Sequence, residues 1–232
     1  MPTIKDALTP CNHGTGGNKP KYIVIHYFGA LGNAASVAEW FRNPSARASA
    51  HYAVDEGNTI YRCVKDTDAA WHCGDGSLHP ECRNWNSIGI EIRPKKRRTG
   101  STGAWDRDWY FDDRALENAL WLIRRLMKQY RIPVENVIRH YDVSGKMCPR
   151  PFVGTDVNTY YNTTGDVQWQ RFRERIEKEM VEKSKMIVDG REVAVERILK
   201  DGTNYVKVRD IAAALDLEVS NKGNIAVLTT KK

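Results

Sequence analysis

Tyr22-Ile-Val-Ile-His-Tyr27 is an unbroken run of β-branched and aromatic residues that contains a single histidine. Such a run is typical of a strand buried at the centre of a sheet. The next apolar segment, residues 33–41, predicts a short helix with Asn33 as its N-cap and Asn43-Pro44 as its end. A buried strand followed directly by a helix indicates the beginning of an α/β domain.

Further strands and helices alternate along the chain. Runs of β-branched residues predict strands, and apolar residues three and four positions apart predict helices. We therefore expect a hairpin at 51–64 around Glu56-Gly57-Asn58, a strand at 87–92, a helix at 113–130 and a short strand at 137–140. The fold class that these elements predict is α/β.

Three polar segments are expected to lack regular structure: 1–20, 74–86 and 95–111. The third contains the densest basic run, Lys95-Lys96-Arg97-Arg98. Because no aromatic residue interrupts this run, we interpret it as a solvated loop, and a contact with a polyanion stays open as the alternative.

The end of the chain predicts a second, smaller unit. Residues 166–183 have a helical pattern, and we take 166–184 as a helical connector after a catalytic domain at 1–165. Residues 185–232 predict a small α+β C-terminal module, with a hairpin around Asp189-Gly190, a strand at 205–208 and a helix at 211–215. Fewer than about 50 residues form a marginal core, so the module is expected to lean on another surface.

Composition narrows the class of protein. The net charge of +7 implies attraction to a polyanion, which nucleic acid, anionic lipid and acidic wall polymers all satisfy. No apolar run approaches the roughly 18 residues of a membrane span. The first residues lack the pattern of a signal peptide, so we expect synthesis in the cytoplasm. The five cysteines are an odd number in a chain that lacks the pattern of an export signal, which argues against a disulfide scaffold. A bridge or metal pair formed by Cys73 and Cys82 stays open.

Three residues have the donor atoms of a catalytic metal site. His26 closes the first strand, and His140 and Cys148 bracket a turn after the strand at 137–140. Catalytic zinc takes three protein ligands and leaves one position for water. Each residue alone has an ordinary alternative, because strand histidines and lone cysteines are more often core residues.

Local sequence favours the metal. His140-Tyr-Asp-Val-Ser-Gly-Lys-Met-Cys-Pro149 resembles the zinc-binding end of the N-acetylmuramoyl-L-alanine amidase family, which is related to certain phage lysozymes and to peptidoglycan recognition proteins. The resemblance covers about residues 10–165 and includes Tyr22–His26, Ser49–Val54 and Asn86–Glu91. It implies a central mixed β-sheet flanked by helices and one zinc ion held by His26, His140 and Cys148. The cysteine is typical of members that hydrolyse peptidoglycan.

The resemblance also implies roles for other residues. Glu91 matches a strand carboxylate that orients or deprotonates the attacking water, and Lys146 matches a catalytic lysine two positions before the cysteine. His51 and His72 match histidines near the cleft, so they are candidates for substrate binding or for support of the site. Some relatives have a catalytic tyrosine where this chain has Ala50, and that role is not transferred.

The function that the resemblance implies is hydrolysis of the amide between N-acetylmuramic acid and L-alanine in bacterial peptidoglycan. Lack of a signal peptide suggests a phage or prophage endolysin that acts on the cell wall after release. The alternatives are a non-catalytic peptidoglycan-binding protein and a nucleic-acid-binding protein with a structural zinc, which would need a fourth ligand. The C-terminal module resembles small domains named for the copper amine oxidase N-terminus, which implies wall anchoring or dimerisation into a homo-oligomer, without copper.

Overall fold

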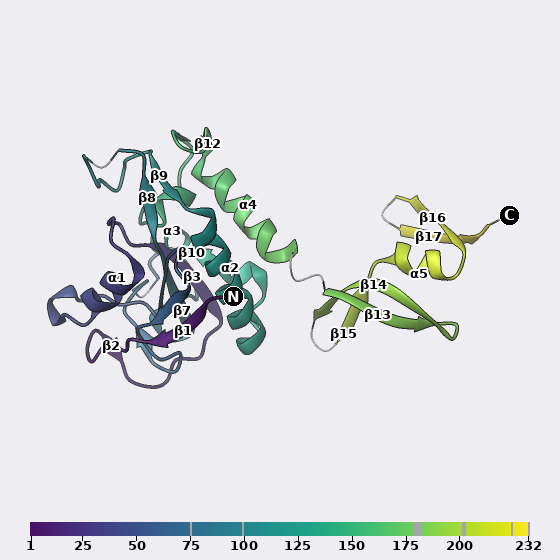
Figure 1. The fold of residues 1–232 in the computed structure, drawn as a ribbon, viewed down its shortest axis with the longest axis horizontal. Coiled ribbons are helices and arrows are strands. Elements are labelled where there is room, and N and C mark those ends of the chain that lie inside the picture. The colour runs from purple at the N-terminus through teal and green to yellow at the C-terminus, as the bar shows by residue number, and fades with distance from the viewer. Residues whose placement is uncertain (75, 99, 179–181, 201–202, 224, 232) are drawn as a thin grey trace. The chain divides into compact units, whose positions relative to one another are not determined.

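The computed structural model describes residues 1–232 except 75, 99, 179–181, 201–202, 224 and 232 (Figure 1). The chain divides into two compact units, Met1–Ile176 and Glu177–Lys232. No described helix is both long enough and apolar enough to cross a bilayer. All five cysteines are free thiols.

A six-stranded sheet forms the centre of the first unit. Its strands, in chain order, are β1 (Thr3–Asp6), β3 (Tyr22–Tyr27), β4 (Tyr52–Val54), β5 (Thr59–Arg62), β7 (Ser87–Ile92) and β10 (Val137–Arg139). The spatial order is β1-β5-β4-β7-β3-β10, and only the β4–β5 pair is antiparallel. The sheet is therefore mixed, as predicted.

The central strands separate two kinds of surface. Every residue of β3 is buried, as its apolar run predicts. In β7, Ile88, Ile90 and Ile92 are fully buried on one face, while Ser87, Gly89 and Glu91 alternate onto the other. At β7, one face of the sheet is thus apolar, and the other presents small and acidic side chains.

Two helices lie on opposite sides of this sheet (Figure 1). Helix α1 (Ala34–Phe41) begins as predicted, because the Asn33 side chain accepts a hydrogen bond from the Ser36 N–H at 2.8 Å. Its buried residues pack in one cluster with Ala53 of β4. Helix α2 (Asp113–Tyr130) contacts β4 and β7, and Leu116, Leu120, Ile123 and Met127, which have the predicted apolar spacing, are among its buried residues.

Short elements complete the first unit. They are β2 (His13–Gly14) paired with β6 (Ala69–Ala70), β8 (Pro94–Lys96) paired with β9 (Trp109–Phe111), β11 (Val157–Asn158) paired with β12 (Thr163–Thr164), the 3-10 turns η1 (Pro44–Ala46), η2 (Asn84–Asn86), η3 (Val134–Asn136) and η4 (Arg150–Phe152), and helices α3 (His140–Ser144) and α4 (Gly165–Lys178). Helix α4 packs through Trp169 and Phe172 against Phe152. Most of this helix therefore belongs to the first unit.

The prediction that residues 1–20 lack regular structure was wrong at β1. Thr3–Asp6 pairs in parallel with β5 at the edge of the sheet. Three of its four residues are exposed, and two are charged. A short polar edge strand has no apolar alternation to reveal it, because its stability comes from the neighbouring strand.

The prediction that residues 95–111 lack regular structure was wrong at both ends, where β8 and β9 pair. The interpretation of Lys95–Arg98 as a solvated loop was wrong at Lys96. The Lys96 side chain is only 2% exposed, because it makes ion pairs with Asp106 and with Asp108, the latter at 2.9 Å. Its ammonium also lies 4.7 Å from the centre of the Trp109 ring. Carboxylates about ten residues away therefore turn an apparent surface lysine into a buried one.

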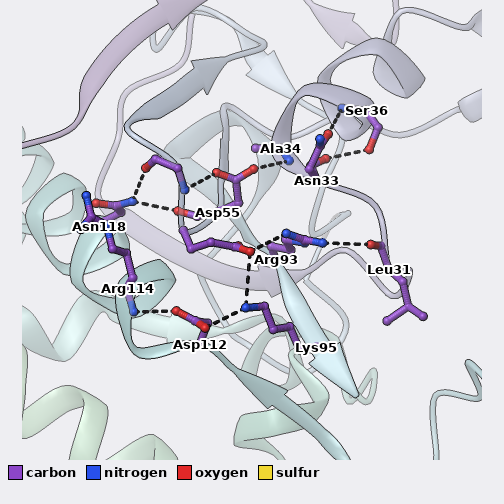
Figure 2. Close-up of polar contacts among 12 residues, drawn as sticks. Leu31, Asn33, Ala34, Ser36, Asp55, Arg93, Lys95, Asp112, Arg114 and Asn118 are labelled. Carbon is purple, nitrogen blue, oxygen red and sulfur yellow. Dashed lines mark hydrogen bonds and ion pairs between the residues drawn. The ribbon is translucent and has the colours of Figure 1, made fainter. Parts of the chain in front are cut away.

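A polar network ties β8 to the first turn of α2 (Figure 2). Lys95 donates to Asp112 at 2.8 Å, and Asp112 accepts a hydrogen bond from the Arg114 N–H at 2.9 Å. Glu56 accepts from Arg93 at 2.6 Å and lies 3.4 Å from the Lys95 ammonium. Asp112 thus caps the helix and holds β8 at the same time.

Replacing Asp112 by alanine is expected to lower the free energy of unfolding by about 1–2 kcal/mol, since it removes both an N-cap and a partly exposed ion pair. Urea denaturation followed by circular dichroism measures this loss. Asp113→Ala is the matched control, because Asp113 is an exposed first-turn carboxylate that is not the cap, and about 0.5 kcal/mol is expected there. Equal losses in the two variants would contradict the dual role of Asp112.

The second unit contains β13 (Glu182–Val188), β14 (Arg191–Lys200) and β15 (Thr203–Val206) in one antiparallel sheet, then α5 (Val208–Ala214) and a hairpin of β16 (Leu217–Lys222) and β17 (Ile225–Thr230). The hairpin around Asp189-Gly190 is confirmed, with both residues at positive φ. The predicted strand at 205–208 was placed two residues too late, because β15 ends at Val206 and Val208 begins α5. The β16–β17 hairpin was not predicted.

The helix predicted at 166–183 ends earlier. Helix α4 stops at Lys178, and residues 182–183 belong to β13, so the prediction was wrong there. Its residues 179–181 lie outside the described part of the chain. The two compact units meet in sequence between Ile176 and Glu177.

Candidate metal centre

Three side chains that are far apart in the sequence converge at the end of β3. The donor atoms of His26, His140 and Cys148 all lie within 4.8 Å of one another, and all three residues are buried. The Cys148 sulfur is 3.7 Å from His26 Nδ1, and the His26 and His140 ring centres are 4.6 Å apart. The structure therefore brings together the three residues that the sequence singled out.

Strand register explains why the two histidines meet. β10 pairs in parallel with β3, with Arg139 opposite Ile25, so the next residues along the two strands are His140 and His26. His140 is the first residue of α3, which Gly145 ends at a positive φ of 76°. The chain then turns back, and the Tyr141 N–H donates to the Cys148 carbonyl at 2.8 Å. This turn brings the thiol back to the histidines.

The segment around the turn is held by Arg139. Its guanidinium pairs with Asp142 at 2.7 Å and donates to the Phe152 carbonyl, also at 2.7 Å. One partly buried side chain thus connects α3 to the segment after Cys148. Fixed backbone on both sides of the thiol is the arrangement that a preformed metal site requires.

Burial sets the protonation of the three donors. It lowers the pKa of His26 well below its ordinary value, with the neighbouring His140 as the next cause, and it lowers the pKa of His140 to about 3. Both imidazoles are therefore uncharged and retain a lone pair. Burial, followed by the charge of Glu91, raises the pKa of the Cys148 thiol. A cation among the three donors would offset the free-energy cost of ionising this buried thiol.

An unpartnered atom shows that the donor set fits a metal. His140 Nδ1 is buried and has no hydrogen-bond partner among the described residues. Buried polar nitrogen atoms are almost always satisfied, so such an atom calls for a ligand. Two imidazole nitrogens and a sulfur are donors that zinc accepts readily. The residues present therefore fit the metal that the sequence predicted.

Glu91 lies beside this cluster on the same face of the sheet. In the strand register it stands opposite His26 on one side and Ala53 on the other, and side chains opposite each other point the same way. Its Oε2 atom is buried without a hydrogen-bond partner in the described chain. Burial raises the pKa of Glu91 to about 8, and the charge of Lys146 opposes this shift. The carboxyl group is thus placed to exchange protons near neutral pH.

Lys146 is exposed in the turn between His140 and Cys148. Its charge acts on Glu91, as above, and it is among the causes that lower the pKa values of His26 and His140. The lysine therefore supplies positive charge at the rim of the cluster.

The other two candidate histidines occupy different positions. His72 contacts the cluster directly, because its Nδ1 lies 3.0 Å from His26 Nε2. His51 is fully buried, and its Nδ1 accepts a hydrogen bond from the Gly89 N–H while its Nε2 is 3.0 Å from the Asp68 carbonyl. Both of its nitrogens are used inside the protein, and the bond from Gly89 ties the His51 ring to β7.

Two residues of the site were not singled out from the sequence. Ser87 bonds to His72 Nε2 at 3.1 Å, and Gly89 lies directly beneath the His72 ring. The signal that could have identified them is the alternation in Ser87–Ile92, where every second residue is small or acidic. Residues i, i+2 and i+4 of a strand share a face, so Ser87 and Gly89 share the face of Glu91.

Gly89→Ala is expected to displace the His72 ring, because a methyl group built there would lie 2.7 Å from His72 Cγ. Overpacking of this kind costs about 1–3 kcal/mol of unfolding free energy. Denaturation measures the loss, and the NMR signals of the His72 ring report the displacement. Gly100→Ala is the control, because a methyl group there meets nothing within 4 Å. An unshifted His72 in the Gly89 variant would contradict the close packing.

Comparison with known proteins agrees with this geometry. Residues 16–151, more than half of the chain, match the family model described as N-acetylmuramoyl-L-alanine amidase. The N-acetylmuramoyl-L-alanine amidase CwlH of Bacillus subtilis is 34% identical over 156 residues, which cover 65% of this chain and 56% of CwlH. XlyA, another amidase of that organism, is 36% identical over 139 residues, which cover 59% of this chain and 41% of XlyA. The chain thus spans about half the length of these relatives.

Solved structures extend the likeness to the fold. A mutant endolysin from Bacillus subtilis is 31% identical to this chain, with a TM-score of 0.57. The matched region covers 76% of this chain and 99% of the endolysin chain. The catalytic domain of XlyA is 30% identical, with a TM-score of 0.56. The matched region covers 75% of this chain and 99% of the XlyA domain. The predicted fold class and family are confirmed. This chain belongs to the N-acetylmuramoyl-L-alanine amidase family.

Proposed function

We propose that this chain hydrolyses the amide bond between N-acetylmuramic acid and L-alanine in bacterial peptidoglycan, with one zinc ion held by His26, His140 and Cys148. The observation that carries the proposal is the convergence of these three buried donors beside Glu91, whose buried Oε2 atom has no hydrogen-bond partner among the described residues. When bound by three protein ligands, zinc supplies a Lewis acid and lowers the pKa of water to about 7.

The chain's own residues supply the remaining chemistry. Glu91 accepts a proton from the attacking water and then returns a proton to the leaving amine, which is the work of a general base followed by a general acid. Its pKa near neutrality suits both steps. Lys146 directs its ammonium toward the negative charge that develops on the amide oxygen. In this proposal the peptidoglycan approaches the buried donors from the side on which Lys146 is exposed.

The biological role in this proposal is host lysis by a phage or prophage endolysin. A structural relative named as an endolysin supports it, and the net charge of +7 favours attraction to acidic wall polymers. Residues 1–165 form the catalytic part in this proposal, and 166–184 connect it to the 185–232 module. That module anchors the protein to the wall or joins two copies of it.

The test is incubation of the purified chain with peptidoglycan, in a zinc-loaded and in a chelated sample. Newly freed L-alanine amino groups are labelled and counted, and reducing sugar ends are measured beside them. We expect amine release only in the zinc-loaded sample, without new reducing ends. Wall binding without amine release would favour a non-catalytic binding protein instead. Release that survives complete metal removal would contradict the role of the metal.

A further inference from the structure

A line of hydrogen bonds runs from the metal-facing histidine to the protein backbone. His26 Nε2 lies 3.0 Å from His72 Nδ1, and His72 Nε2 lies 3.1 Å from the Ser87 hydroxyl. The Ser87 hydroxyl in turn donates to the Arg83 carbonyl at 2.6 Å. The line therefore ends on a group that can only accept a hydrogen bond.

The terminal carbonyl determines the direction of every bond in this line. Because Ser87 donates its one hydrogen to Arg83, it must accept from His72, so the proton of an uncharged His72 ring is on Nε2. His72 Nδ1 then has a lone pair and accepts from His26 Nε2–H. The Nδ1 atom of His26, 3.7 Å from the Cys148 sulfur, is left without a proton.

The His72 ring is held in the position that this line requires. The Asn84 side-chain oxygen accepts the backbone N–H groups of His72 and Cys73, at 3.1 and 3.0 Å. The ring packs against Gly89, where a Cβ atom would not fit. It contacts the His26 ring edge to face, with an angle of 83° between the two ring planes. Both ring nitrogens of His72 are used in the line. Neither ring nitrogen of His72 is thus left over for another hydrogen bond.

We propose that His72, with Ser87 behind it, is a positioning residue that fixes His26 in the tautomer whose Nδ1 lone pair faces His140 and Cys148. This inference rests on the proposed function, because the site it prepares is the zinc site. Without an acceptor at Nε2, His26 could place its proton on either nitrogen, and one of the two forms cannot bind a cation at Nδ1. Partners of this kind are worth about 10–100-fold in metal affinity.

The first measurement needs no metal. Long-range ¹H–¹⁵N NMR spectra of the metal-free protein distinguish the two tautomers of each histidine. We expect His26 in the Nε2–H form in the wild-type chain. In Ser87→Ala the direction of the line is no longer fixed, so we expect a mixture of His26 tautomers. A wild-type His26 with its proton on Nδ1 would overturn the proposal, and an unchanged spectrum in Ser87→Ala would remove Ser87 from it.

The second measurement is zinc affinity, determined by competition with a chromophoric chelator. His72→Leu removes the acceptor and is expected to weaken zinc binding about 10–100-fold. His72→Gln keeps an oxygen that accepts from His26 and is expected to restore most of the affinity. His79→Leu is the matched control, because His79 lies in the same loop and its ring Nδ1 accepts hydrogen bonds from the backbone N–H groups of Glu81 and Cys82, not from a metal-site residue.

The pattern across the variants separates positioning from general stability. Loss in His72→Leu, rescue in His72→Gln and no change in His79→Leu would support the proposal. Equal losses in both His72 variants, or wild-type affinity in both, would overturn it. If the wild-type chain binds no zinc, the proposed function fails, while the tautomer spectra still decide whether the line of hydrogen bonds is present.

Discussion

Cys148→Ser is expected to weaken zinc binding by more than about 100-fold and to remove amine release from peptidoglycan at the same zinc concentration. Loss of a residue that merely supports a ligand costs about 10–100-fold, and loss of the ligand itself should cost more. Serine nearly matches the shape of cysteine, but its hydroxyl does not ionise to provide the charge of a thiolate. Chelator competition measures the affinity, and the amine assay measures the activity.

A second buried cysteine provides the control. Cys63 is fully buried, packs in one cluster with residues of α1, and is not a member of the three-donor group. Cys63→Ser is expected to cost stability, because it buries a new hydroxyl, while zinc affinity stays at the wild-type level. If Cys148→Ser bound zinc as tightly as the wild-type chain, the thiol would not be a ligand.

Glu91→Gln is expected to lower kcat by about 10²–10⁴-fold and to leave zinc affinity close to that of the wild-type chain. Glutamine keeps the size of the side chain and loses the ability to take up and return a proton. KM should change little, because the proposed role of Glu91 lies in the chemical step and not in holding the substrate. Steady-state kinetics with a soluble muropeptide separates the two parameters.

Glu56→Gln serves as the comparison for this variant. Glu56 is also a partly buried carboxylate, but it pairs with Arg93 and Lys95 in the network beside α2. Its loss is expected to affect stability and to leave kcat unchanged. A Glu91→Gln enzyme with wild-type kcat would show that another group moves the protons, and a parallel loss of zinc would show that Glu91 acts through the metal site.

Strong local patterns account for what could be predicted. The β3 and β7 runs and the α2 spacing each contain enough apolar residues to determine their structure without help from the rest of the chain. The three donors were recognised because the motif around His140 and Cys148 is specific. The geometry of His140 and Cys148 is determined by one short turn, so the short motif alone is enough to identify both residues as ligand candidates.

Features that depend on distant partners could not be predicted. β1 exists because β5 offers it an edge, and Lys96 is buried because Asp106 and Asp108 close over it. The tautomer of His26 depends on a carbonyl of Arg83, which the sequence does not connect with it. In each case a polar residue acquires its role from strand pairing or packing, which no local pattern records.

The separation of the donors has a consequence for folding. His26 and Cys148 are 122 positions apart, so the site is complete only after β10 has docked beside β3 and almost the whole first unit has formed. An ion held there joins the two ends of that unit much as a cross-link would, and it has no equivalent site in the unfolded chain. Bound metal should therefore slow unfolding and raise the melting temperature in proportion to the logarithm of its free concentration. The cation of the proposed function would therefore also protect the fold from proteolysis.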